Sequence, residues 1–81
     1  MEQYLATFHT HLAALRTSRT LTAAGVAARM MPVPRSVSSS CGTCVSYTAV
    51  EPMLASMDED AESVYRVEEN SFRLVKSFEE E

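Results

Sequence analysis

The sequence predicts an α+β fold, in which short strands alternate with two helices around one small core. Alternation of apolar and polar residues recurs in several short segments, a pattern typical of strands. One longer segment repeats its small and apolar residues every three or four positions, which indicates a helix. The chain has 81 residues, 46% of them hydrophobic, and this suits one domain with a modest core.

The chain is expected to begin with a strand over residues 3–8, followed by a helix over residues 11–24. Aromatic and aliphatic side chains alternate with smaller ones in the strand. Thr10 is a candidate N-cap, because its hydroxyl can accept a hydrogen bond from a free N–H of the first helical turn. Gly25 is suited to the left-handed conformation that often follows a helix.

A second strand is expected over residues 26–33. It should end there, because Pro32 and Pro34 have no backbone N–H to donate to a neighbouring strand. The serine-rich segment 35–43 is expected to be a loop. This loop is longer than the usual connection between two elements, which favours a functional role. Alternation resumes over residues 44–50, where we expect a third strand.

A short second helix is expected to begin at Glu51 and Pro52, because proline is tolerated in the first helical turn. A fourth strand follows over residues 63–67. A turn at residues 69–71 then leads into a short strand or a packed tail. The last three residues, 79–81, are all glutamate, and we expect this acidic end to be frayed.

The predicted order is β-α-β-β-α-β, the ferredoxin-like split unit, with a short C-terminal strand or tail. We expect one domain over residues 1–81, with its core at about 3–67 and an extension at 68–81. In this fold the first and third strands are antiparallel neighbours. Residues 9–11 should therefore lie beside residues 41–44, next to the start of the first helix. A helix N-terminus favours an anion, and a thiolate is one.

The net charge of −4 is unevenly distributed along the chain. Residues 1–50 contain four arginines and one glutamate, a balance of +3, whereas residues 51–81 contain three basic and ten acidic residues, a balance of −7. Four scattered arginines do not make the basic patch that nucleic-acid binding requires. No apolar run is long enough to cross a membrane, and residues 1–4 lack the features of a secretory leader. We therefore expect a cytoplasmic protein with reduced thiols.

The only two cysteines, Cys41 and Cys44, are spaced Cys-x-x-Cys and end the serine-rich loop. In a reducing compartment such a pair is more often reactive or metal-binding than a structural disulfide. Cys41, followed by Gly42, is the candidate nucleophile, and His9 is a candidate to polarise it. Cys44 could resolve a mixed disulfide on Cys41, or it could be a buried strand residue.

Two functions remain open on these residues. One is a small thiol-disulfide redox protein that uses Cys41 and Cys44. The other is a structural or interaction domain with a metal bound by Cys41, Cys44, His9 and His11, which would need four converging ligands. Nearby anion-binding candidates are Arg35, Ser40 and Thr10.

Residues 3–67 resemble the small bacterial domains called selenium/sulfur carrier-like proteins. The hallmark of these domains is a Pro-x-Pro-Arg segment followed by a serine-rich stretch and Cys-Gly. The matching residues in this chain are Pro32, Pro34, Arg35, Ser36, Cys41 and Gly42. Cys44 is not part of the hallmark, and the family is more acidic and lysine-rich in the first helix than residues 16–19 of this chain.

The resemblance implies a carrier rather than a turnover enzyme. Cys41 would hold sulfur or selenium as a persulfide or selenosulfide, and Gly42 would let the backbone approach closely. The implied partners are a donor protein such as a cysteine desulfurase and an acceptor protein, and no cofactor is expected. Whether two copies pair through an exposed sheet edge stays open.

Overall fold

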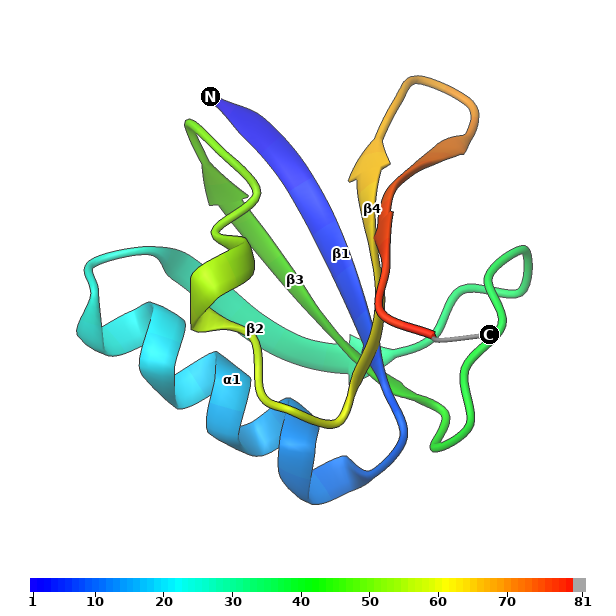
Figure 1. Cartoon of the computed structure of the whole chain (residues 1–81). Coiled ribbons are helices and arrows are strands. Elements are labelled where there is room, and N and C mark those ends of the chain that lie inside the picture. Colours follow the sequence, from blue (N-terminus) through cyan, green and yellow to red (C-terminus); the bar gives the residue numbers. More distant parts are fainter. Residues whose placement is uncertain (80–81) are drawn as a thin grey trace.

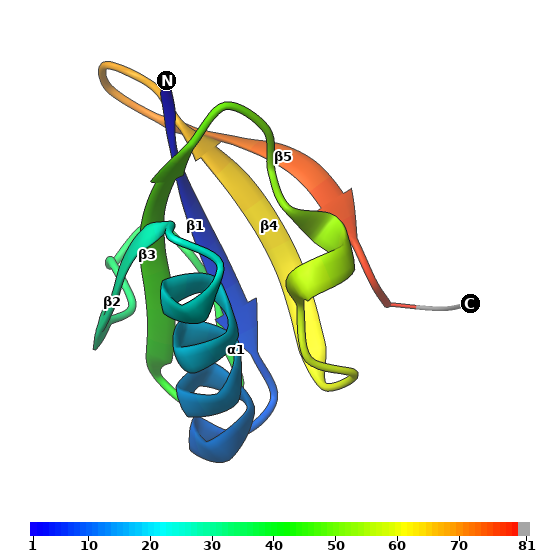
Figure 2. The ribbon, with the colours of Figure 1, turned by 90° about the vertical axis from the view of Figure 1, so that its left-hand side faces the viewer.

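The computed structural model describes residues 1–79 as one five-stranded antiparallel sheet with a single α-helix on one face (Figures 1 and 2). The α+β class is confirmed. The elements in chain order are β1 (Glu2–Phe8), α1 (His11–Ala23), β2 (Ala27–Pro32), β3 (Thr43–Ala49), the 3₁₀ turn η1 (Leu54–Ser56), β4 (Ala61–Val67) and β5 (Phe72–Ser77).

The strands lie in the order β2-β3-β1-β4-β5, and each neighbouring pair is antiparallel. The expected antiparallel pairing of the first and third strands is confirmed, with Thr7 opposite Cys44. The prediction of a second helix is wrong, because the segment after β3 forms only the three-residue turn η1. The full ferredoxin-like β-α-β-β-α-β order is therefore not confirmed, and the sheet has a fifth strand. Met53, which precedes that turn, has a left-handed backbone with φ of 57°, so a continuous helix from Pro52 is interrupted there.

The ends of α1 follow from its sequence. Thr10 caps the helix, because its extended backbone lets its hydroxyl accept a hydrogen bond from the N–H of Ala13 at 3.0 Å. At the other end Gly25 has φ of +84°. The N–H groups of Gly25 and Val26 donate to the carbonyls of Thr22 and Leu21, which is a Schellman motif. Both predicted helix signals are confirmed.

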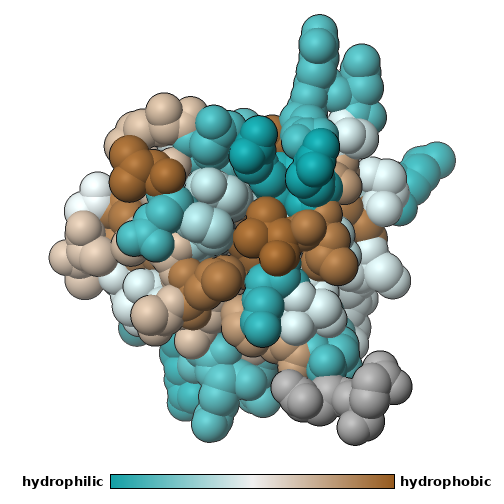
Figure 3. All heavy atoms as spheres, turned by 45° about the horizontal axis from the view of Figure 1, so that its top comes forward, coloured by the Kyte–Doolittle hydropathy of each residue, from teal (hydrophilic) through white to brown (hydrophobic). Residues whose placement is uncertain are grey.

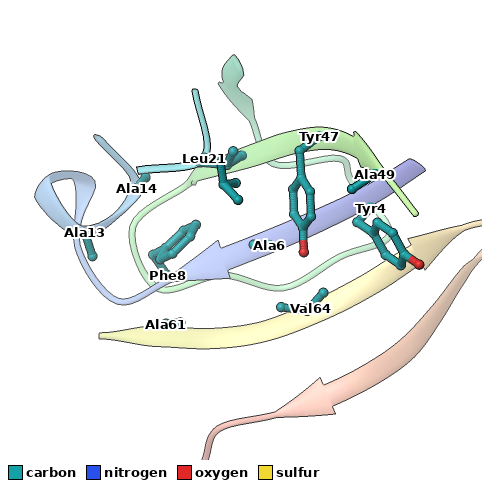
Figure 4. Packing of buried hydrophobic residues seen from close by; sticks show 11 residues of the cluster. Tyr4, Ala6, Phe8, Ala13, Ala14, Leu21, Tyr47, Ala49, Ala61 and Val64 are labelled. Atoms are coloured by element: carbon teal, nitrogen blue, oxygen red, sulfur yellow. The ribbon is translucent and has the colours of Figure 1, made fainter. Parts of the chain in front are cut away.

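The sheet has a different hydrophobic cluster on each face. The larger cluster lies under α1, and Figure 4 shows its side chains filling the space between the helix and the sheet. Its buried members are Tyr4, Ala6, Phe8, Ala13, Ala14, Leu21, Val45, Tyr47, Ala49, Ala61 and Val64. The smaller cluster lies on the opposite face, around Leu5, Val37 and Cys44. Val37 belongs to the loop after β2, so this loop, rather than a helix, covers the second face.

The C-terminal extension is part of the sheet, since β5 pairs with β4 along its length. Phe78 then packs against the cluster under α1. The expected frayed acidic end falls partly on residues 80–81, which lie outside the described residues, whereas Glu79 is described and contacts His9.

Some apolar side chains remain at the surface. The most exposed are Met1, Leu12, Val50, Leu74 and Val75. Figure 3 looks toward the end of the molecule that carries the N-terminus and the β4–β5 turn, and it shows apolar patches between hydrophilic projections. No helix in the described part of the chain is long and apolar enough to span a membrane.

Candidate functional site

The loop between β2 and β3, residues 33–42, is fixed to the rest of the molecule at several points. A turn closes where the N–H of Val37 donates to the carbonyl of Pro34, and the side chain of Val37 is buried on the second face. The hydroxyl of Ser39 donates to the carbonyl of Phe8 at 3.1 Å, at the end of β1. Because these contacts come from different elements, the loop has a defined conformation despite its serine content.

Cys41 lies at the end of this loop, between two contacts with the β1–α1 connection. Ser39 binds Phe8 on one side of it, and Thr43 Oγ1 lies 3.3 Å from His11 Nδ1 on the other. Residues 9–11 and 41–44 therefore share one edge of the sheet, as the strand pairing predicted. The Cys41 thiol is free and half-buried against the cluster under α1, and it donates to the carbonyl of Thr43 at 3.4 Å.

Gly42 is needed for its backbone conformation. Its φ is +76°, in the left-handed region that favours glycine. A Cβ atom built on Gly42 would meet nothing within 4 Å, so the positive φ, and not close packing within the chain, favours glycine at this position. The carbonyl of Gly42 accepts a hydrogen bond from the N–H of Val33 at 3.1 Å, which closes the base of the loop.

Cys44 has a different environment, inside β3. Its side chain is fully buried with Leu5 and Val37, and its thiol lies 3.7 Å from the carbonyl of Pro32. Burial, and to a lesser degree the nearby Cys41, raises the pKa of the Cys44 thiol to about 11. At neutral pH Cys44 is therefore almost entirely the unreactive thiol.

The two cysteines do not form a redox pair in this conformation. Cys41 packs against the cluster under α1, whereas Cys44 packs in the cluster on the opposite face of the sheet, and both are free. A disulfide requires its two Cβ atoms to face one another at about 4 Å. The packing of the two thiols in different clusters does not favour the thiol-disulfide alternative.

Among the described residues, the polar contacts of the His9 ring are with two glutamates and not with either cysteine. Its Nδ1 atom lies 3.2 Å from a carboxylate oxygen of Glu62, and its Nε2 atom lies 3.1 Å from Glu79. Glu62 also accepts hydrogen bonds from the hydroxyl of Ser40 and, at 3.3 Å, from its N–H. Ser40, the residue before Cys41, is thus linked through Glu62 to His9.

The sequence alone did not identify Glu62 or Glu79 as members of this cluster. Glu62 lies where the pairing of β1 with β4 shifts register, between the partners of Thr7 and Phe8. Such a bulge re-aims side chains without a clear signal in the local sequence. Glu79 follows β5, whose pairing with β4 returns the end of the chain to this edge of the sheet.

The four ligands of the metal alternative are not brought together. His11 contacts Thr43, His9 lies between two glutamates, and the two cysteines lie on opposite faces. Among residues 1–79, the one group of three potential metal ligands within 4.8 Å of one another contains His9 but neither cysteine.

The anion-binding candidates are also separated. The Thr10 hydroxyl is occupied by the helix cap, and the Ser40 hydroxyl is occupied by Glu62. Arg35 is exposed in the turn between Pro34 and Val37 and forms no salt bridge with a described residue. Of the three, Arg35 has the side chain most available to a partner.

Residues 3–70 match the family model described as "Putative Se/S carrier protein-like". The chain belongs to this family. The match includes the whole serine-rich loop with Cys41, and it ends before β5 and Glu79. The comparisons with curated proteins and with solved structures gave no significant match.

Proposed function

We propose that this member of the Se/S carrier-like family carries sulfur or selenium on Cys41, as a persulfide or selenosulfide. The observation that carries the proposal is the contrast between the two thiols. Cys41 is free and half-buried, in a Cys-Gly turn that hydrogen bonds hold in place. Cys44 is fully buried in β3, and burial raises the pKa of its thiol. One accessible thiol suits a carrier, while a redox enzyme would need two thiols that meet.

The transfer needs no external oxidant. The Cys41 thiolate attacks the terminal sulfur of a donor persulfide, a new S–S bond forms on Cys41, and the S–S bond of the donor breaks. The electron pair of the broken bond leaves on the donor cysteine as its thiolate. The donor then has a thiol again, and Cys41 holds the transferred sulfur. An acceptor thiol reverses the same exchange.

The proposed partners are a donor of the cysteine desulfurase type and an acceptor protein. The exposed Arg35 guanidinium, in the same loop as Cys41, is a suitable contact for an acidic group on such a partner. A reducing compartment such as the cytoplasm, where both thiols stay free, suits this role.

The test is to incubate the chain with a cysteine desulfurase and cysteine, then to measure its intact mass without reductant. We expect a one-sulfur adduct that a dithiol removes. Cys41→Ser should abolish the adduct, and Cys44→Ala should retain it. An adduct that depends on Cys44, or no adduct on a folded chain with any supplied persulfide donor, would contradict the proposal.

A further inference from the structure

Three side chains from separate parts of the chain converge beside the cysteine loop. His9 follows β1, Glu62 lies in β4 and Glu79 follows β5. Each offers one ligand atom, and these atoms all lie within 4.8 Å of one another. We propose that His9, Glu62 and Glu79 form a binding site for a divalent transition-metal ion, with zinc as the favoured ion. This site is separate from the proposed carrier function of Cys41.

The donor set suits zinc. One imidazole nitrogen and two carboxylate oxygens are common zinc ligands, bound at about 2.0–2.2 Å. Ligand atoms around a tetrahedral ion then lie roughly 3.3 Å apart. The contact of His9 with Glu62 at 3.2 Å already has about this length. Glu79 contacts the opposite ring nitrogen, Nε2, and its side chain is 55% exposed, so it has room to shift toward an ion that His9 shares with Glu62.

The charge balance of the cluster also favours a cation. Two carboxylates face one imidazole, and among the described residues neither Glu62 nor Glu79 forms a salt bridge with lysine or arginine. A neutral imidazole has a single N–H, so it can donate to only one of the two carboxylates. The Glu62 side chain is only 13% exposed, and although Ser40 donates two hydrogen bonds to it, no lysine or arginine among the described residues balances its charge.

The site is open to a ligand. A hollow of about 300 Å³ lies against the cluster and is lined by Ser38, Ser39, Ser40, Glu62, Ser63, Tyr65 and Glu79. This leaves room for water to complete the coordination. Because Glu62 also binds Ser40, a metal here would join the C-terminal segment to the residue next to Cys41. Glu79 lies beyond the family match, so the full ligand set depends on this chain's own extension.

The test is calorimetric titration of zinc into the full chain carrying Cys41→Ser, which removes the half-buried Cys41 thiol as a competing ligand. We expect one zinc per chain. His9→Gln and Glu79→Gln should each weaken binding by about tenfold or more, since each removes one ligand. Cobalt provides a second readout, because its visible spectrum should report nitrogen and oxygen ligands without a thiolate charge-transfer band.

Two matched controls keep the result specific. His11→Gln removes the neighbouring histidine, and Glu69→Gln removes an exposed acid from the β4–β5 turn; both should leave the affinity unchanged. If His9→Gln disturbs the fold, the exposed Glu79→Gln variant decides. The absence of stoichiometric binding, or equal losses in the control variants, would overturn the proposal. Neither result would affect sulfur loading on Cys41.

Discussion

The two faces of the sheet are covered in different ways, and each holds one of the cysteines. The face that holds Cys41 is covered by α1, and eleven buried side chains form its cluster. The face that holds Cys44 is covered by the loop after β2, and among residues 1–79 its hydrophobic cluster has three buried members, Leu5, Val37 and Cys44. Two thiols three positions apart thus differ in exposure because the loop passes from one face to the other between them.

The comparison shows that the Cys-x-x-Cys spacing is misleading in this chain. The spacing places two thiols close in sequence, but β3 begins between them and directs the second into the sheet. Cys41 therefore belongs to the turn that ends the loop, while Cys44 belongs to the packing of the second face.

The largest expected effect is on alkylation of the native chain by iodoacetamide at pH 8. With a pKa of about 11, roughly one in a thousand Cys44 thiols is ionised at that pH, and the side chain is also buried. Cys41 should react at least about 100-fold faster than Cys44. Peptide mapping by mass spectrometry gives both rates.

The Val37→Ala variant sharpens this measurement. Val37 packs on Cys44 from the loop, so its truncation should raise the Cys44 rate and change the Cys41 rate much less. Rates for the two cysteines within tenfold of each other in the wild-type chain would refute the contrast between the faces.

A smaller effect is expected on the pH dependence of stability. Cys44 ionises near 9.0 when unfolded and at about 11 when folded, so the folded state favours the protonated thiol. Its contribution is fully present below pH 9 and is lost as the pH rises toward 11. Two pKa units correspond to at most about 2–3 kcal/mol. Urea unfolding at pH 7, 9 and 10.5 measures the loss.

Cys44→Ala is the control for this loss. Burial also raises the pKa of Tyr47, so both proteins should lose some stability in strong base. Only the difference between them reports Cys44, and it should shrink between pH 9 and 11. A difference in stability that stays constant over this range would show that burial does not raise the pKa of the Cys44 thiol.

The smallest expected effect is a difference in stability between two threonine-to-valine variants. The two threonines, Thr7 and Thr17, are buried on opposite sides of the sheet. The Thr7 hydroxyl, opposite Cys44, is buried without a hydrogen-bond partner among the described residues, whereas the Thr17 hydroxyl accepts from the N–H of Asp58 at 3.0 Å. Thr7→Val should be neutral or slightly stabilising. Thr17→Val should cost about 1–2 kcal/mol, because it leaves a backbone donor unpaired. Chemical denaturation measures both, and equal costs would contradict the contrast.

Local signals were sufficient for most of the fold. Thr10 and Gly25 end α1 through contacts within a few residues, and alternation located the first four strands to within about two residues. The fifth was left open between a short strand and a packed tail, and it is a strand. The position of Cys41 beside residues 9–11 followed from the pairing of β1 with β3. These features are determined by neighbours in sequence or by a common topology.

The failures have a common cause in distant contacts. The segment after β3 does not form a helix, because its backbone groups bind distant side chains instead. The Tyr47 hydroxyl donates to the carbonyl of Pro52, and the N–H of Asp58 donates to the hydroxyl of Thr17. The cluster of His9 with Glu62 and Glu79 needs a bulge in β4 and the return of the chain through β5. None of these contacts leaves a signal in the local sequence.

The addition of β5 beyond the family match has a consequence for self-association. Without it, β4 would be an edge strand, and its free N–H and C=O groups could pair with another chain. With β5 present, β5 itself is the edge strand. It carries Arg73 and Lys76, and charged side chains of this kind discourage pairing with another chain. Shortening the chain to the family limits should therefore make it prone to aggregation through β4.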